Sequence, residues 1–371
     1  MALDEYAAAV DESKYFDYSS RAILRAFRYL ESVEKGVSFL SNLKTKINNP
    51  EFYDIKHHPH ARITQGGENI PGPWNDIQYD SVARTVIALS KHLGLAHDKS
   101  LIEKCEPGLR VAIRYLFDAI WDTSVSPRIL TVCANEWEEK DEPYLRSPLF
   151  SSVLGLLYAA SKHCAGMEEY IRTDVDFREF ERVTQSMLQE YFLRDGVLRM
   201  IKRFSEPSTG ICTSSLWLLT SYDVFPLKSE PFEKTVDSLA SSKNLAVELY
   251  LNHGSNKKTF GLRRYEIENA AEHTPYVDQY WGGQAWVITT AQLATALAMK
   301  GDMDVANDLF LLCLQARNAD GTLPEQFDGT FHNQPKHELW KEWSKVPTPP
   351  QYLAWSHAEV LRAYAAIYKS N

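Results

Sequence analysis

Acidic side chains beside tryptophans are the residues of this sequence best suited to catalysis. Glu138 and Glu139 follow Trp137 directly, and a like charge and an apolar ring both raise the pKa of a carboxyl group. Glu325 stands in the stretch DGTLPEQFDG at 320–329. Hydrolysis of a glycosidic bond needs two carboxyl groups, one protonated as general acid and the other ionised as base or nucleophile. The alternative interpretation is that both stretches are ordinary solvated turns.

The aromatic residues are the second unusual feature. The chain has 9 Trp, 19 Tyr and 16 Phe, which make up 12% of its 371 residues. Flat ring faces stack on the C–H faces of a sugar, and polar side chains beside them bind its hydroxyl groups. A core would scatter the tryptophans evenly, so their clustering favours a carbohydrate substrate. Seven of the nine lie in or beside four segments: Trp74; Trp137; Trp281 and Trp286; Trp340, Trp343 and Trp355.

Further polar residues lie in the same segments. Arg263 and Arg264 suit sugar hydroxyls, but they suit ion pairs with the glutamates that follow them equally well. Asp76 and Asp80 are candidate hydroxyl acceptors. Asp80 also fits the N-cap of the helix after it. These four assignments therefore stay open on the residues alone.

Metal and cofactor sites are not indicated. His57, His58 and His60 in KHHPHAR lack acidic residues at ligand spacing, which favours a polar loop. Asp302 and Asp304 fit the acidic start of a helix, because the calcium-loop pattern fails around them. The sequence contains no glycine-rich nucleotide motif and no G-x-S-x-G. We expect neither a metal nor an organic cofactor.

Charge and composition exclude other classes of protein. The net charge of −9 argues against a nucleic-acid partner, which requires a basic face. No apolar run approaches the ~18 residues of a membrane span. The five cysteines are far apart and odd in number, so we expect buried free thiols. The acidic N-terminus does not resemble a signal peptide, which predicts a cytoplasmic protein. Nothing indicates the oligomeric state.

The elements that position these residues are predicted to be helices. Apolar residues recur at helical spacing almost throughout the chain, whereas 128–133 is the best strand candidate and is short. No composition break marks a linker, so we predict one all-α domain over 1–371, a closed helical toroid rather than a solenoid. The predicted helices include segments around 23–30 and 82–89, and 108–121, 148–164, 176–193, 232–252, 284–299, 302–316 and 355–368.

Each tryptophan-rich segment precedes a predicted helix. Trp74 and Trp137 stand before helices that begin near residues 80 and 147, and Trp286 and Trp355 open the helices after them. If alternate helices form an inner ring that runs in one direction, these segments meet at one mouth. Helix N-termini would bring free N–H groups and a partial positive charge to that mouth.

Four segments in order resemble glycoside hydrolase family 15, the glucoamylases, over 60–370. GPWNDIQYDSVARTVIAL at 72–89 is similar to the family's G-x-W-G-R-P-Q-x-D-G-x-A-x-R, and WEE at 137–139 to its W-E-E. RRYEIEN with YWGGQAW is similar to G-R-Y-x-E-D with N-G-N-P-W-F. GTLPEQFD with LAWSHAEVLRAY is similar to G-x-x-x-E-Q-Y-D with L-T-W-S-Y-A-A-L-L-T-A.

The resemblance implies an (α/α)6 barrel and an inverting, exo-acting enzyme for an α-glucoside or another α-linked oligosaccharide. It places the general acid on Glu138 and the general base on Glu325. Substrate contacts are implied for Trp74, Gln78, Asp80, Trp137, Glu139, Arg264, Tyr265, Trp286 and Trp355.

Two departures concern the first sugar. Tyr18 and Ser19 stand where the family's W-x-R-D motif has Arg and Asp, and Asp76 replaces a family arginine. The sugar bound there can therefore differ from glucose. Two alternatives remain: a polysaccharide or oligosaccharide lyase on the same toroid, with a Tyr or His base, and a carbohydrate-binding relative without turnover. A lyase would draw on Tyr18, Arg263, Arg264, Tyr265 and His332.

Overall fold

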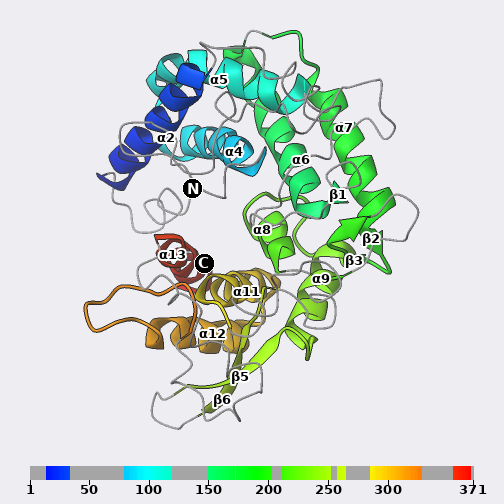
Figure 1. Cartoon of the computed structure of the whole chain (residues 1–371), viewed down its shortest axis with the longest axis vertical. Helices are drawn as coiled ribbons and strands as arrows, with labels where there is room; N and C mark the ends of the chain where they lie inside the picture. Colours follow the sequence, from blue (N-terminus) through cyan, green and yellow to red (C-terminus); the bar gives the residue numbers. More distant parts are fainter. Residues whose placement is uncertain are drawn as a thin grey trace, which may run out of the picture. The chain divides into compact units, whose positions relative to one another are not determined.

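The computed structural model describes residues 14–33, 79–118, 149–171, 173–202, 210–211, 213–251, 257–264, 285–327 and 354–368 (Figure 1). These residues form two compact units. Unit 1 draws on 11–192 and 201–207, and unit 2 draws on 193–200 and 208–371. The single domain over 1–371 stays a prediction.

Unit 1 is a set of packed helices. α2 packs on α4 and α5, α4 packs on α5 and α6, and α6 packs on α7. The Asp176 carboxylate accepts a hydrogen bond from the Glu179 N–H at 2.9 Å and so caps the start of α7. The elements are α2 (Lys14–Val33), α4 (Tyr79–Ala96), α5 (Lys99–Asp118), β1 (Leu149–Phe150), α6 (Ser151–Ala165), η4 (Glu168–Tyr170), α7 (Phe177–Met187), the π-helical turn η5 (Leu188–Phe192) and β4 (Ile201–Lys202).

α5 begins nine residues before the predicted start at residue 108 and runs through Pro107. A proline inside a helix removes one hydrogen bond and costs about 3 kcal/mol. Leu101, Ile102 and Cys105 offset this cost, because all three are buried ahead of the proline. Burial of an apolar face therefore decides where this helix starts.

Unit 2 is built around α11. Every residue from Val287 to Leu297 is buried, and the helix packs against α8, α12 and α13. Figure 1 shows α11 between α13 and α12, with the β5–β6 hairpin beyond α12. The elements are β2 (Leu193–Arg194), β3 (Val197–Leu198), α8 (Ser214–Thr220), α9 (Glu230–Ser241), β5 (Ala246–Leu251), β6 (Lys257–Leu262), α11 (Val287–Lys300), α12 (Met303–Gln315) and α13 (Ala354–Tyr368).

The helix predicted for 232–252 is wrong in its second half. α9 ends at Ser241, and Ala246–Leu251 forms a strand paired antiparallel with β6, Ala246 opposite Leu262. Alternate residues of this strand, Val247, Leu249 and Leu251, are buried. This two-residue period is typical of a half-buried strand. Residues 246–251 form a strand rather than a helix because they pair with β6, which lies outside the predicted helix.

Most other helix predictions are confirmed to within a few residues. The predicted ranges 148–164, 284–299, 302–316 and 355–368 correspond to α6, α11, α12 and α13. The range 176–193 corresponds to α7 and the π-helical turn after it. The strand candidate at 128–133 lies outside the described residues. None of the helices in the described ranges is both long enough and apolar enough to cross a membrane.

Candidate active site

The predicted base, Glu325, lies at a bend between two buried residues. Glu325 is partly exposed, whereas Pro324 and Gln326 next to it are buried. The Val287 N–H at the start of α11 donates to the Glu325 carbonyl oxygen at 3.1 Å, and Trp286 pairs with Gln326 in an antiparallel bridge. The backbone of this segment is therefore held against the start of α11. The main-chain atoms from which the Glu325 side chain extends are fixed by these contacts.

The first turn of α13 holds the same segment from another direction. Ser356 Oγ donates to the Pro324 carbonyl oxygen at 2.7 Å, and the Leu323 N–H donates to His357 Nε2 at 2.9 Å. Trp355 precedes these two residues directly. The structure thus brings Trp355 and Glu325, 30 positions apart in the numbering, to adjoining backbone.

Ser356→Ala is expected to lower the free energy of unfolding by about 2 kcal/mol, because it removes a buried donor and leaves the Pro324 carbonyl oxygen without that bond. Urea unfolding measures the loss. Ser241→Ala is the matched control, since Ser241 Oγ makes a similar bond to the Asp237 carbonyl oxygen on the exposed face of α9. The control should change stability by less than about 0.5 kcal/mol. Equal losses of stability in Ser356→Ala and Ser241→Ala would contradict a stabilising role for the hydrogen bond from Ser356 to Pro324.

Arg264 and Trp286 form one stacked pair. The Arg264 guanidinium lies 4.7 Å from the centre of the Trp286 ring, and each residue is only 1% exposed. The Arg264 carbonyl oxygen accepts from Thr213, and the Trp286 N–H donates to Leu262 at 2.8 Å. The cation–π contact stabilises both side chains away from water. Their contact with a sugar stays a prediction, and the structure places them beside the segment of Glu325.

Arg263 contacts the backbone at the start of β5. Its guanidinium donates to the carbonyl oxygens of Asn244 and Ala246, both at 3.1 Å, and so holds the backbone that leads into β5. Partial burial lowers the pKa of this guanidinium, since burial disfavours the charged form. These contacts give Arg263 a structural role.

Two of the seven clustered tryptophans, Trp286 and Trp355, lie within the described residues. Trp286 is the N-cap residue of α11 and Trp355 is the second residue of α13, as their predicted positions at helix N-termini require. Trp355 also stacks on Trp217 of α8, with ring centres 4.7 Å apart. Sequence reasoning missed Trp217, because this tryptophan stands alone, outside the four tryptophan-rich segments.

Asp80 lies in unit 1, as do Tyr18 and Ser19, two of the three residues that depart from the family pattern. Asp80 is in the first turn of α4, 6% exposed, and pairs with Arg84 at 3.6 Å. It therefore lies inside the helix rather than at its N-cap. Tyr18 is 55% exposed under the Arg21 guanidinium, and its neighbour Ser19 is buried.

Asp80→Asn is expected to raise the stability of the protein at neutral pH and to change it little in strong acid. Burial raises the pKa of the Asp80 carboxyl above its ordinary value of 3.8, although Arg84 acts in the opposite direction. The folded state thus binds the proton more tightly than the unfolded state does. The wild-type protein therefore loses stability as the pH rises from 3.8 through the raised pKa, whereas asparagine does not titrate.

Urea unfolding of the two proteins across this pH range tests the prediction. Asp304→Asn is the control, because Asp304 is exposed in the first turn of α12. That change should lower stability slightly, since it removes a negative charge near a helix N-terminus. A wild-type protein more stable than Asp80→Asn at neutral pH would mean that attraction to Arg84 outweighs burial.

Six predicted site residues lie outside the described ranges: Trp74, Gln78, Trp137, Glu138, Glu139 and Tyr265. Asp76 and the histidines 57, 58 and 60 lie outside them as well. The separation of the Glu138 and Glu325 carboxyl groups is therefore carried forward as a prediction.

The thiols and acids of the described residues match their expected structural roles. Cys105, Cys164 and Cys313 are free and buried, as predicted, and burial raises the pKa of Cys105 to about 12. Asp302 is the N-cap residue of α12 and binds Lys300 at 2.9 Å. Within the described ranges, no group of three or more His, Cys, Asp or Glu residues is arranged to hold a metal ion.

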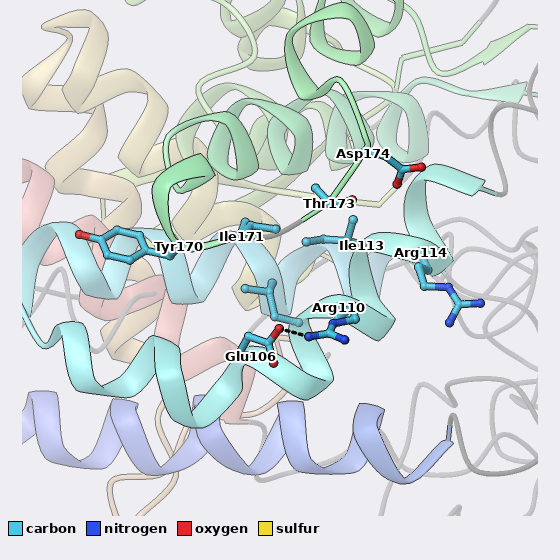
Figure 2. Close-up of a pocket in the computed structure, with 9 residues that line it drawn as sticks. Glu106, Arg110, Ile113, Arg114, Tyr170, Ile171, Thr173 and Asp174 are labelled. Atoms are coloured by element: carbon cyan, nitrogen blue, oxygen red, sulfur yellow. Dashed lines mark hydrogen bonds and ion pairs between the residues drawn. The ribbon is translucent and has the colours of Figure 1, made fainter.

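A surface pocket of about 160 Å³ lies in unit 1 between α5 and residues 170, 171, 173 and 174 (Figure 2). Arg110 and Glu106 on its rim point toward each other and form an ion pair. The Lys99 ammonium lies 5.6 Å from the centre of the Tyr170 ring. None of the predicted catalytic or sugar-binding residues lines this pocket. The segment of Glu325 therefore remains the better candidate for the active site.

Curated proteins with related sequences include two glycosidases. An uncharacterized glycosyl hydrolase of Methanocaldococcus jannaschii is 24% identical over 294 residues, which cover 77% of this chain and 41% of that protein. An isomaltose glucohydrolase of Kribbella flavida is 25% identical over 302 residues, 81% of this chain and 67% of that protein. The match thus spans less than half the length of the first relative. No family model matches the chain.

Solved structures identify the fold. A glycosidase variant in complex with glucose superposes with a TM-score of 0.66 at 21% identity, over 99% of this chain and 84% of that one. A glycoside hydrolase family 15 glucoamylase from Hypocrea jecorina superposes with a TM-score of 0.59 at 15% identity, over 99% and 63%. The predicted all-α (α/α)6 barrel is therefore confirmed. Membership of family 15 stays a prediction at these identities.

Proposed function

We propose that this protein is a glycoside hydrolase that removes sugars from the ends of α-linked glucosides with inversion. One observation supports the proposal: Glu325 is a partly exposed residue on a segment whose backbone is held by α11 and α13, and Ser356, the neighbour of Trp355, binds that segment at Pro324. A general base must be held at a fixed place next to the attacking water, and a backbone anchored on two sides favours this.

In the proposed mechanism, Glu325 removes a proton from a water molecule that attacks the anomeric carbon. Glu138 donates its proton to the glycosidic oxygen, which leaves as the C–O bond breaks. Attack on the face opposite the leaving group inverts the anomeric centre. This mechanism requires the two carboxyl groups to be about 6.5–9.5 Å apart, so that water fits between Glu325 and the sugar.

The relatives support an α-glucoside as substrate. One curated relative is an isomaltose glucohydrolase, and one structural neighbour was solved with glucose. Tyr18 and Ser19 stand in place of the family's charged pair. This change favours a first sugar or a linkage that differs from the one the family usually binds. Isomaltose is therefore the first substrate to test, followed by other α-linked disaccharides.

A panel of α-linked di- and oligosaccharides followed by proton NMR tests the proposal. We expect release of a free monosaccharide whose first detected anomer is β. Initial release of the α-anomer would exclude inversion, and with it the direct attack of a water molecule activated by Glu325 on the anomeric carbon. With uronate polymers added as substrates, an unsaturated uronate product would instead identify a lyase. Glycan binding without turnover on any member of the panel would identify a non-catalytic relative.

A further inference from the structure

Trp355 rests on a buried tryptophan. The rings of Trp355 and Trp217 are 4.7 Å apart at their centres and nearly parallel, with 7° between their planes. Trp217 is only 3% exposed, whereas Trp355 is partly exposed. One face of Trp355 is therefore covered by a ring that does not face solvent. This stack determines how the rest of Trp355 is presented.

The buried ring is in turn fixed by a carboxylate. Trp217 Nε1–H donates to Glu359 Oε1 at 3.1 Å. Arg362 pairs with the other oxygen of Glu359 at 3.4 Å and donates to the Thr220 carbonyl oxygen at 2.8 Å and to Ser221 Oγ. Since Thr220 and Ser221 end the helix that carries Trp217, the contacts close a ring between α8 and α13.

The charges in this network are deeply buried. Glu359 is 5% exposed and Arg362 is 6% exposed. A buried ion pair is often no more stabilising than apolar residues of similar volume, because desolvation costs about as much as the attraction returns. In the family pattern that LAWSHAEVLRAY resembles, these two positions hold alanine and threonine. The pair is therefore weak evidence for a gain in stability, and it contacts Trp217 and the end of the helix that carries Trp217.

We propose that Trp217 and Glu359 are positioning residues that hold the Trp355 ring as a rigid platform for the C–H face of a pyranose. The proposal rests on the proposed function, because it requires a sugar next to Glu325. A fixed ring loses little conformational freedom when the sugar binds, so the anchor acts on the affinity for substrate rather than on the chemical step.

Two variants separate positioning from stability. Trp217→Phe keeps a ring under Trp355 but removes the N–H donor to Glu359. The double variant Glu359→Ala/Arg362→Thr removes the anchor without leaving a buried charge unpaired. We expect KM for isomaltose to rise about tenfold in both, which is the scale of one aromatic contact, with kcat little changed. The exciton-coupled circular dichroism of the stacked indoles should weaken in the double variant, which retains both tryptophans.

Phe232→Leu is the matched control, because Phe232 is a fully buried ring on α9 in the same unit. It should lower the melting temperature without changing KM or the exciton signal. An unchanged KM in the two test variants, or a matching rise in KM for Phe232→Leu, would overturn the proposal. If the wild-type protein hydrolyses no glycoside, the proposed function fails separately. Loss of the exciton signal in the double variant would then still support positioning by Glu359, and an unchanged signal would overturn it.

Discussion

Glu325→Gln is expected to lower kcat for isomaltose by about a hundred- to ten-thousandfold, the usual contribution of a positioned general base. Glutamine has nearly the same shape but cannot accept the proton of the attacking water. The carbonyl oxygen that binds the Val287 N–H belongs to the backbone, so the substitution leaves this contact in place. Stopped assays of released glucose measure the effect, and thermal unfolding should show a melting temperature close to that of the wild-type protein.

Asp320→Asn is the matched control for this loss. Asp320 lies in the same loop, five residues before Glu325, and one of its carboxylate oxygens accepts from the Thr322 N–H at 3.0 Å. Asparagine retains such an oxygen, so hydrolysis should stay near the wild-type rate. Near-normal turnover by Glu325→Gln would end the assignment of the base. An equal loss in both variants would point to a general disturbance of the loop.

Gly108→Ala is expected to lower the free energy of unfolding by about 3 kcal/mol or more, at the upper end of what overpacking costs. A Cβ atom at this position of α5 would lie 2.0 Å from the carbonyl oxygen of Phe27 and 2.7 Å from its carbonyl carbon. Both are backbone atoms of α2 and cannot rotate away. The two helices must therefore move apart, which loosens the buried contacts of Phe27 in unit 1. Urea or thermal unfolding measures the loss.

Gly94→Ala provides the opposite result at a second helical glycine. A Cβ atom there meets nothing within 4 Å, and the residue is exposed near the end of α4. Alanine should raise stability by about 0.5–1 kcal/mol, because it restricts the unfolded chain more than glycine does. If both substitutions stabilised the protein, α2 would not be seated on α5 at Gly108.

Much of the fold could be predicted from apolar spacing. α11 and α12 are found where the sequence predicts them, since a continuous apolar helix leaves few alternatives. The short helix α8 and the β5–β6 hairpin were missed. Strand pairing depends on a partner elsewhere in the chain, and seven residues of α8 are too few to show a period.

The candidate site was only partly predictable. Glu325 and Trp355 could be proposed from the sequence because their segments carry recognisable residue patterns, and their roles stay predictions. Trp217 and Arg362 were not found, because their contacts join residues far apart in the sequence: Trp217 meets Glu359 across 142 positions. Such pairs leave no local signal. The burial of Arg264 and Trp286 could not be predicted either, because a tryptophan that binds sugar and a tryptophan in the core are the same residue type in the sequence.

By itself, the sequence determined the helical class of this protein, the clustering of its tryptophans and the presence of a carboxylate suited to act as a base. These properties depend on residue type and on spacing within one or two turns. The tertiary structure alone decided how the backbone beside Glu325 is held, that Trp217 covers Trp355 and that Glu359 and Arg362 are buried as a pair. Those properties arise when α8, α11 and α13 pack together and exclude water between residues that the chain itself keeps far apart.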